Sequence, residues 1–148
     1  MRQIEHQTQN MLDSCVSTCV AMLVGIPASE VEQKFHTAYH AGEVTLEVML
    51  GEYGIHCSRM YTDDRVVFGH VYLVLACSLA QPGRFHMVIL DARSISNCKV
   101  YDPAKGFKDG EYLTSYYYWP EDEPPEQKSV QLGAFIPVVR IKGEEWNE

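Results

Sequence analysis

Cys15 is the residue that most directly suggests chemistry in this sequence of 148 residues. It follows Asp13 and Ser14, either of which can serve as a helix N-cap, and it begins an apolar stretch that predicts a helix from about Cys15 to Val24. A thiol in the first turn of a helix faces unsatisfied backbone N–H groups and the positive end of the helix dipole, which favour the thiolate. The position therefore suits a nucleophile, and a plain core cysteine is the alternative.

His86 and Asp102 supply the second part of the candidate site. Residues 84–90 and 97–101 predict two strands of a hairpin that turns about Ser94, and in this hairpin His86 faces Asp102. A carboxylate beside an imidazole fixes its tautomer and stabilises the imidazolium that forms when the ring takes a thiol proton. The alternative is a core histidine and an unrelated aspartate in the turn that precedes a proline.

Gln9 stands six residues before Cys15 and could complete the site. A side-chain amide that reaches the same point as the backbone N–H of the cysteine makes an oxyanion hole, which stabilises a transition state by roughly 3 to 4 kcal/mol. Because Gln3 and Gln7 lie in the same stretch, an ordinary surface glutamine remains the alternative.

Helices are predicted for the first third of the chain. After the helix that begins at Cys15, a second helix is expected to follow Pro27, with Ser29 as N-cap and Glu32 completing a capping box, and to end near Tyr39. A third, short helix is predicted from Thr45 to Tyr53.

Strands are predicted for the remainder, where short runs are rich in β-branched and aromatic residues. These runs are residues 70–77, 84–90, 97–101 and 134–141, with a shorter candidate at 56–61. Pro137 cannot donate to a ladder and places the last strand at an edge or a bulge. Residues 107–132 read as a long irregular loop. Helices followed by an antiparallel sheet predict an α+β fold, in one domain that spans residues 1–148.

Composition excludes several classes of partner. Lys and Arg number 12 against 20 Asp and Glu, and the net charge of −8 argues against nucleic acid. Apolar runs fall short of the roughly 18 residues of a membrane span, and the N-terminal stretch lacks the apolar segment of a signal peptide. We therefore expect no membrane partner and a cytoplasmic location. The five cysteines form no C-x-x-C pair, so reduced thiols are expected.

Four other side chains offer rival chemistry. Cys19 lies one turn after Cys15 and could join His86 on zinc, but no fourth ligand is apparent, so we interpret Cys19 as a core residue. His36 and His40 share a helix face but lack the glutamate of an H-E-x-x-H motif, which favours a solvated face. His70 is the rival base, but no acid stands at a matching register, and we prefer His86. No metal and no cofactor are predicted.

Several motifs give these residues a family resemblance. They are Gln9, SCVSTCVAML at 14–23, FHMVILD at 85–91 and VYDPAKG at 100–106. In order and spacing they resemble the C39-type branch of the papain-like cysteine peptidases. That family has a Gln six residues before the Cys, a helix with A-M-L or A-M-I, an H-x-V-V-L strand and a V-x-D-P-A-x-G partner. The resemblance covers most of the chain up to about Gly106 and the final strand, and residues 107–132 do not align.

The resemblance implies a papain-like fold, with a helix packed on an antiparallel sheet and the site at their junction. It implies Cys15 as nucleophile, His86 as general base and then acid, Asp102 as the residue that orients His86, and Gln9 as oxyanion donor. The expected function is hydrolysis of an amide bond in a peptide or protein substrate, through a thioacyl-enzyme.

Two departures from the family pattern keep other functions open. Ser14 stands where the family usually has an acidic residue, and Val16 stands where it usually has glycine. A β-branched residue at that position crowds the first helical turn. The alternatives are therefore an inactive C39-like binding module, or the same triad used for glutamine deamidation or acyl transfer.

Overall fold

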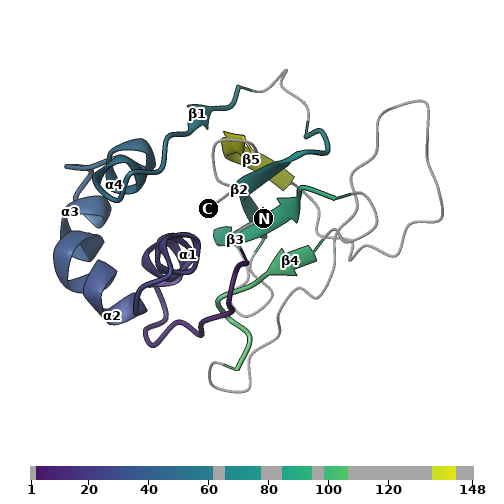
Figure 1. Ribbon diagram of the computed structural model, residues 1–148. Helices are drawn as coiled ribbons and strands as arrows, with labels where there is room; N and C mark the ends of the chain where they lie inside the picture. The colour runs from purple at the N-terminus through teal and green to yellow at the C-terminus, as the bar shows by residue number, and fades with distance from the viewer. Residues whose placement is uncertain (1–2, 62–65, 78–84, 95–98, 107–134, 143–148) are drawn as a thin grey trace.

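The structure is a computed structural model that describes residues 3–61, 66–77, 85–94, 99–106 and 135–142. Helices from the first third of the chain lie on one side of an antiparallel sheet built from the later segments (Figure 1). The predicted α+β architecture is therefore confirmed. The predicted loop at 107–132 lies outside the described residues.

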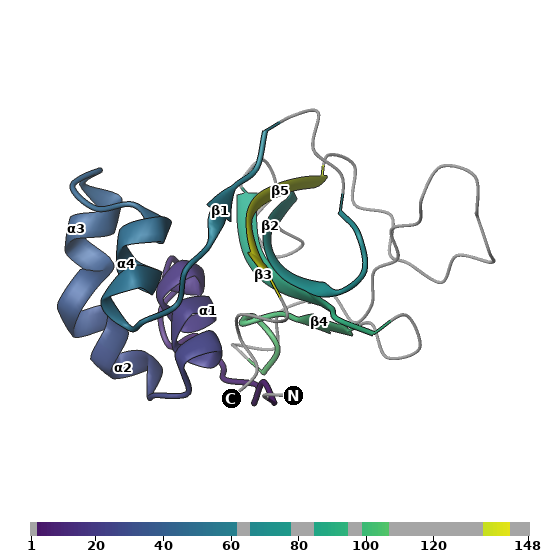
Figure 2. The same ribbon diagram turned by 45° about the horizontal axis from the view of Figure 1, so that its top comes forward.

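The helical layer consists of α1 (Cys15–Val24), α2 (Ala28–Val31), a π-helical turn η1 (Glu32–His36), α3 (Thr37–His40) and α4 (Leu46–Glu52). The predicted bounds of α1 are confirmed. Its residues from Val16 to Leu23 are all buried, and α1 lies between the other helices and the sheet (Figure 2). Gly25 ends α1 with φ at +87°, the left-handed conformation that glycine adopts without strain. The helix predicted from Thr45 begins at Leu46, and Thr45 caps it with its side chain, which accepts the N–H of Val48.

The predicted capping box of the second helix is wrong. The helix begins at Ala28, with Pro27 in the N-cap position and no side-chain cap from within the helix. The Ala28 N–H instead donates to Oε1 of Gln7 at 2.9 Å, while Nε2 of Gln7 donates to the Ile26 carbonyl at 2.7 Å. Pro27 presets the backbone for a helix start two residues earlier than the expected cap at Ser29 implies, and a distant side chain satisfies the first free N–H.

The sheet contains β1 (Ser58–Arg59), β2 (His70–Cys77), β3 (Phe85–Ala92), β4 (Lys99–Tyr101) and β5 (Phe135–Lys142). All pairings are antiparallel, in the order β1-β5-β2-β3-β4. The last strand carries the expected irregularity, because the register of β5 on β2 shifts where Leu73 pairs with Val139 and Val74 with Pro137. The bulge adjoins the proline, which cannot donate to the ladder.

The predicted register of the β3–β4 hairpin is wrong by two residues. Leu90 pairs with Val100 and Asp91 with Lys99, so His86 does not lie directly opposite Asp102. A shift of two residues leaves every side chain on its original face. Asp102, which follows β4, is therefore a diagonal neighbour of His86.

Both faces of the sheet are covered. One face packs against the helices through residues that include Val71, Leu73, Met87 and Ile89. The other face carries a second apolar cluster that includes Met60, Tyr72, Val88 and Leu90. Continuous burial on both faces explains why β2 and β3 read as uninterrupted apolar runs.

Within the described residues no single helix has the length and apolarity of a membrane span. Among these residues, α1 and the helical segment Ala28–His40 are long and apolar enough when taken together, but a bend of 119° separates them.

Gln7→Ala is expected to lower the free energy of unfolding by about 1 to 2 kcal/mol, because it leaves the Ala28 N–H and the Ile26 carbonyl without their partner. Urea unfolding measures the change. Gln3→Ala removes an exposed glutamine from the same segment and should change stability by less than about 0.5 kcal/mol. Equal effects of the two substitutions would contradict the capping role.

Candidate active site

Cys15 lies at the boundary between core and solvent, at the first residue of α1. Its neighbour Val16 is only 7% exposed and belongs to the core beneath the helix, so the branched side chain packs inward. Ser14 is buried, and its hydroxyl bonds the backbone N–H and carbonyl of Met11. Ser14 thus holds the turn before Cys15, and Val16 anchors the first turn of α1 to the core.

His86 connects Cys15 to Asp102. Its Nε2 lies 2.5 Å from Oδ1 of Asp102, and a hydrogen bond with the side chain of Cys15 is among the causes that raise the pKa of His86. Because Asp102 occupies Nε2, Nδ1 is the ring nitrogen that remains for the thiol. The structure therefore brings three of the sequence-predicted residues into one hydrogen-bonded row, although the predicted register was wrong.

The electrostatics of this row favour a protonated imidazole. Burial of His86 disfavours the charged ring, but the hydrogen bonds and charges of Asp102 and Cys15 outweigh it and raise the pKa of His86 from 6.5 to about 9. An imidazolium beside a sulfur stabilises the thiolate, which is the nucleophilic form of cysteine.

Asp102 is 3% exposed and its polar atoms are well supplied with partners. Besides His86, the backbone N–H of Ala104 donates to Oδ1 at 2.8 Å. The Asp102 carbonyl accepts from Nε2 of His6 at 2.8 Å and from the Lys105 N–H at 3.1 Å. These bonds fix the carboxylate in the orientation that His86 meets.

The N-terminal segment 6–9 lies against the turn 102–106. The Gln9 N–H donates to the Pro103 carbonyl at 2.8 Å, and the Thr8 hydroxyl donates to the Lys105 carbonyl at 2.7 Å. Gly106 has φ at +88°, and a Cβ at this position would lie 3.2 Å from Oγ1 of Thr8. Sequence reasoning missed the roles of His6 and Thr8, and Gly106 was the available signal that another segment approaches here closely.

Gln9 is 3% exposed and lies beneath the loop that leads to Cys15. Its Nε2 donates to the carbonyls of Met11 at 2.9 Å and Leu12 at 3.1 Å. Two carbonyl acceptors require the nitrogen on this side, so both amide hydrogens are committed to the loop. Donation to an oxyanion requires one of them to leave its loop carbonyl.

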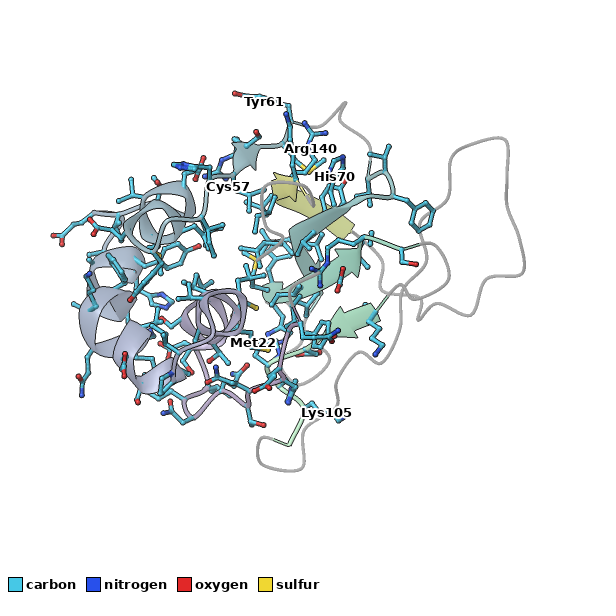
Figure 3. All side chains as sticks on the ribbon, viewed as in Figure 1. Met22, Cys57, Tyr61, His70, Lys105 and Arg140 are labelled. Carbon is cyan, nitrogen blue, oxygen red and sulfur yellow. The ribbon has the colours of Figure 1, made fainter. Side chains whose placement is uncertain are left out.

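The rival residues lie elsewhere. Cys19 is fully buried, and its Sγ donates to the Met87 carbonyl at 3.4 Å. The pKa of its thiol is raised, mainly by burial and to a smaller extent by the charges of Cys15 and Asp102. His70 pairs with Ala92, whereas His86 pairs with Ala76. The two histidines are thus six residues apart along the strand pair, or about 20 Å. Figure 3 shows His70 at the end of β2 near Arg140.

An open pocket of about 480 Å³ lies between the turn that joins α3 to α4 and the sheet. Its lining includes Tyr39, Val44, Arg59 and Met87, and Cys15, His86 and Asp102 are not among the lining residues. Burial and then the charge of Cys15 raise the pKa of the Tyr39 hydroxyl.

The charge in this pocket is largely balanced. Arg59 donates from Nε and Nη2 to the two carboxylate oxygens of Glu47, at 2.9 and 2.6 Å. The rest of the lining includes Leu46, Leu75 and Val138. The pocket therefore suits an apolar side chain.

Comparison of this chain with models of known families, with curated proteins and with solved structures finds no match.

The raised pKa of His86 predicts a stability that falls with rising pH. The protonated ring stabilises the fold fully below pH 6.5, and this contribution declines above 6.5 and is lost above about 9. The total is about 3 kcal/mol, since each pKa unit corresponds to about 1.4 kcal/mol. Urea unfolding at pH 6.5 to 8.5 measures the slope.

Asp102→Asn is the control for this slope, because the amide keeps the size of the side chain and removes its charge. The variant should lose most of the pH dependence in this range. Parallel profiles for the two proteins would show that the Asp102 carboxylate does not raise the pKa of His86.

Proposed function

We propose that this chain is a papain-like cysteine peptidase of the C39 type, which hydrolyses an amide bond in a peptide or protein. The observation that carries the proposal is the hydrogen-bonded row of Cys15, His86 and buried Asp102 at the start of a buried helix. Nucleophile, base and orienting acid in mutual contact are the requirements of thiol hydrolysis.

The reaction proceeds in two steps. The Cys15 thiolate attacks the carbonyl carbon, and His86 gives its proton to the leaving amine, so that the C–N bond breaks and a thioacyl-enzyme forms. The neutral ring then takes a proton from a water molecule as that water attacks the thioester. The C–S bond breaks, the acid product leaves, and the Cys15 thiolate and the protonated ring of His86 are restored. Throughout, Asp102 stabilises the imidazolium and holds its orientation.

Oxyanion stabilisation comes from two sources in this proposal. The first is the set of backbone N–H groups in the first turn of α1, which have no acceptor within the helix. The second is the Gln9 amide, once substrate binding draws one hydrogen from the Met11 or Leu12 carbonyl.

The surroundings of Cys15 favour activity over an inactive binding module. Val16 packs into the core, so the residue that replaces the usual glycine does not cover the nucleophile. Ser14 stands where the family usually has an acidic residue. Its hydroxyl stabilises the preceding turn through hydrogen bonds with the backbone of Met11. The pocket between the α3–α4 turn and the sheet provides room for an apolar side chain of the substrate.

Iodoacetamide is expected to label Cys15 faster than Cys57 at pH 6, because the ring of His86, whose pKa is raised to about 9, lies beside Cys15 as a cation. Labelling should slow at least tenfold in His86→Ala, measured by mass spectrometry of each cysteine. Cys57 is an internal control for an unactivated thiol. Its pKa is raised to about 11, mainly by burial and to a smaller extent by the charge of Glu47. Equal labelling of Cys15 and Cys57 at pH 6 would rule out an activated nucleophile.

Hydrolysis of a library of quenched fluorescent peptides tests the reaction itself. Cys15→Ala should lower kcat by roughly 10⁶, the loss expected when a nucleophile is removed. Adding a primary amine separates the chemistries, since a transferase forms an amide product with the amine whereas a peptidase releases acid. Unchanged turnover by Cys15→Ala would exclude the proposed mechanism.

Val44→Trp is expected to lower kcat/KM for peptides roughly 10- to 100-fold, because the indole fills the pocket that takes the substrate side chain. The alkylation rate of Cys15 should not change. Val48→Trp introduces the same side chain at a position on α4 that is 51% exposed, outside the pocket lining. Equal kinetics for the two variants would show that this pocket does not bind substrate.

A further inference from the structure

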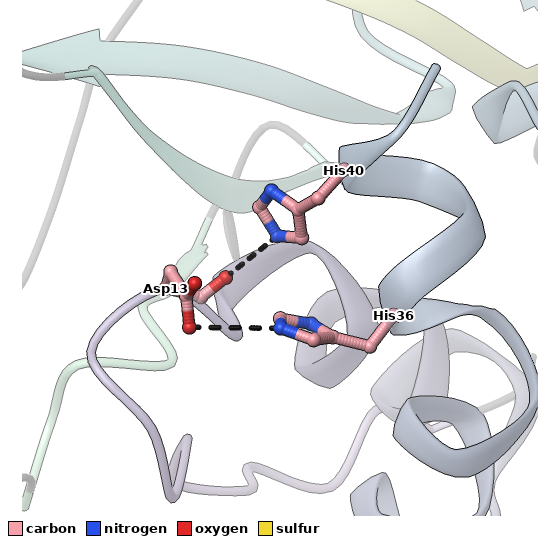
Figure 4. A group of neighbouring side chains, drawn as sticks. All are labelled: Asp13, His36 and His40. Atoms are coloured by element: carbon pink, nitrogen blue, oxygen red, sulfur yellow. Dashed lines mark hydrogen bonds and ion pairs between the residues drawn. The ribbon is translucent and has the colours of Figure 1, made fainter. Parts of the chain in front are cut away.

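A second group of ligand-type side chains lies apart from the Cys15–His86–Asp102 row. Asp13, His36 and His40 each offer one ligand atom, and these atoms all lie within 4.8 Å of one another (Figure 4). Asp13 belongs to the loop two residues before Cys15, whereas His36 ends η1 and His40 ends α3. The group thus joins two segments that are more than 20 residues apart in the chain.

The distances within the group approach those of a metal site. Nε2 of His36 lies 3.6 Å from Oδ1 of Asp13, and Nε2 of His40 lies 3.1 Å from the Asp13 backbone carbonyl. Two ligand atoms held tetrahedrally at 2.0 to 2.2 Å from one ion are about 3.4 Å apart. The His36–Asp13 pair therefore has nearly this spacing, and a small rotation of the exposed His40 ring completes the set.

The helix that carries the histidines is irregular at this point. A π-helical turn from Glu32 to His36 interrupts the α-helix and accommodates one extra residue. One residue rotates the following helix by roughly 100°. The turn therefore sets the direction in which His36 and His40 face, and their rings lie 4.5 Å apart on the side that meets Asp13.

Charge attraction alone is a weak reason for this grouping. Asp13 has a side chain that is 58% exposed, and an ion pair in water at such a site contributes at most about 1 kcal/mol. Two imidazoles and one carboxylate instead form a donor set of the kind that binds zinc. Calcium and magnesium prefer sites made of oxygen alone.

We propose that Asp13, His36 and His40 bind a divalent transition-metal ion, zinc by the chemistry of the donors, with water in the fourth position. The ion links the loop before the nucleophile to α3. It thereby restrains the turn that presents Cys15, without contributing a ligand to the reaction.

The test uses the full chain carrying Cys15→Ser, so that the thiol at the reaction centre cannot bind the ion. Isothermal titration with Zn²⁺ should give one site per chain, and Co²⁺ should give the visible absorption bands of a four- or five-coordinate ion. His36→Ala, His40→Ala and Asp13→Ala should each weaken binding by at least 10- to 100-fold. His56→Ala removes an exposed histidine outside the group and should leave the affinity unchanged.

The outcomes separate this proposal from the catalytic one. Equal Zn²⁺ affinity with and without His36 and His40 would overturn it, as would binding that occurs with Cys15 and vanishes in Cys15→Ser. Circular dichroism verifies that each variant is folded, and His36→Gln keeps a polar side chain where alanine disturbs the helix. An inert Cys15 would leave the metal result unaffected, because the titration does not require turnover.

Discussion

The structure depends on a carboxylate that has been removed from water. Asp102 is almost fully buried, and an unpaired buried anion costs several kcal/mol, so the surrounding chain must supply charge and hydrogen bonds. His86 supplies the charge, and the Ala104 N–H supplies a further hydrogen bond to the carboxylate. In return, Asp102 helps to keep the imidazole protonated, and in the proposed mechanism this charge activates Cys15. The same interaction thus stabilises the fold and would serve the proposed chemistry.

Rigid elements hold each member of this row. Cys15 begins a helix that is buried along most of its length, and His86 extends from a strand whose residues 87 to 92 are buried. Asp102 lies in a turn that the N-terminal segment fastens through backbone and side-chain hydrogen bonds. Because the helix packs on the sheet through a shared apolar core, the thiol and the imidazole approach each other without a flexible connection.

The differences between expectation and structure have identifiable causes. The hairpin register was wrong by an even number of residues, and the alternation of side chains preserved the shared face of His86 and Asp102. The bulge in β5 was predictable because Pro137 lacks an N–H wherever it is placed. The capping box at Ser29 failed because Gln7, twenty-one residues before Ala28, supplied the acceptor instead. Local rules succeeded where no distant group competed with them.

The sequence by itself determined the helix that begins at Cys15, the central strands and the shared face of His86 and Asp102. All of these follow from periodicity and the two-residue repeat of a strand, which act over short stretches of chain. Only the tertiary structure decided the contacts between remote segments. His6 and Thr8 meet the Asp102 turn, Gln9 turns its amide into a loop, and Asp13 meets His36 and His40. Such contacts depend on how whole elements pack, and no local pattern encodes the distance between two elements.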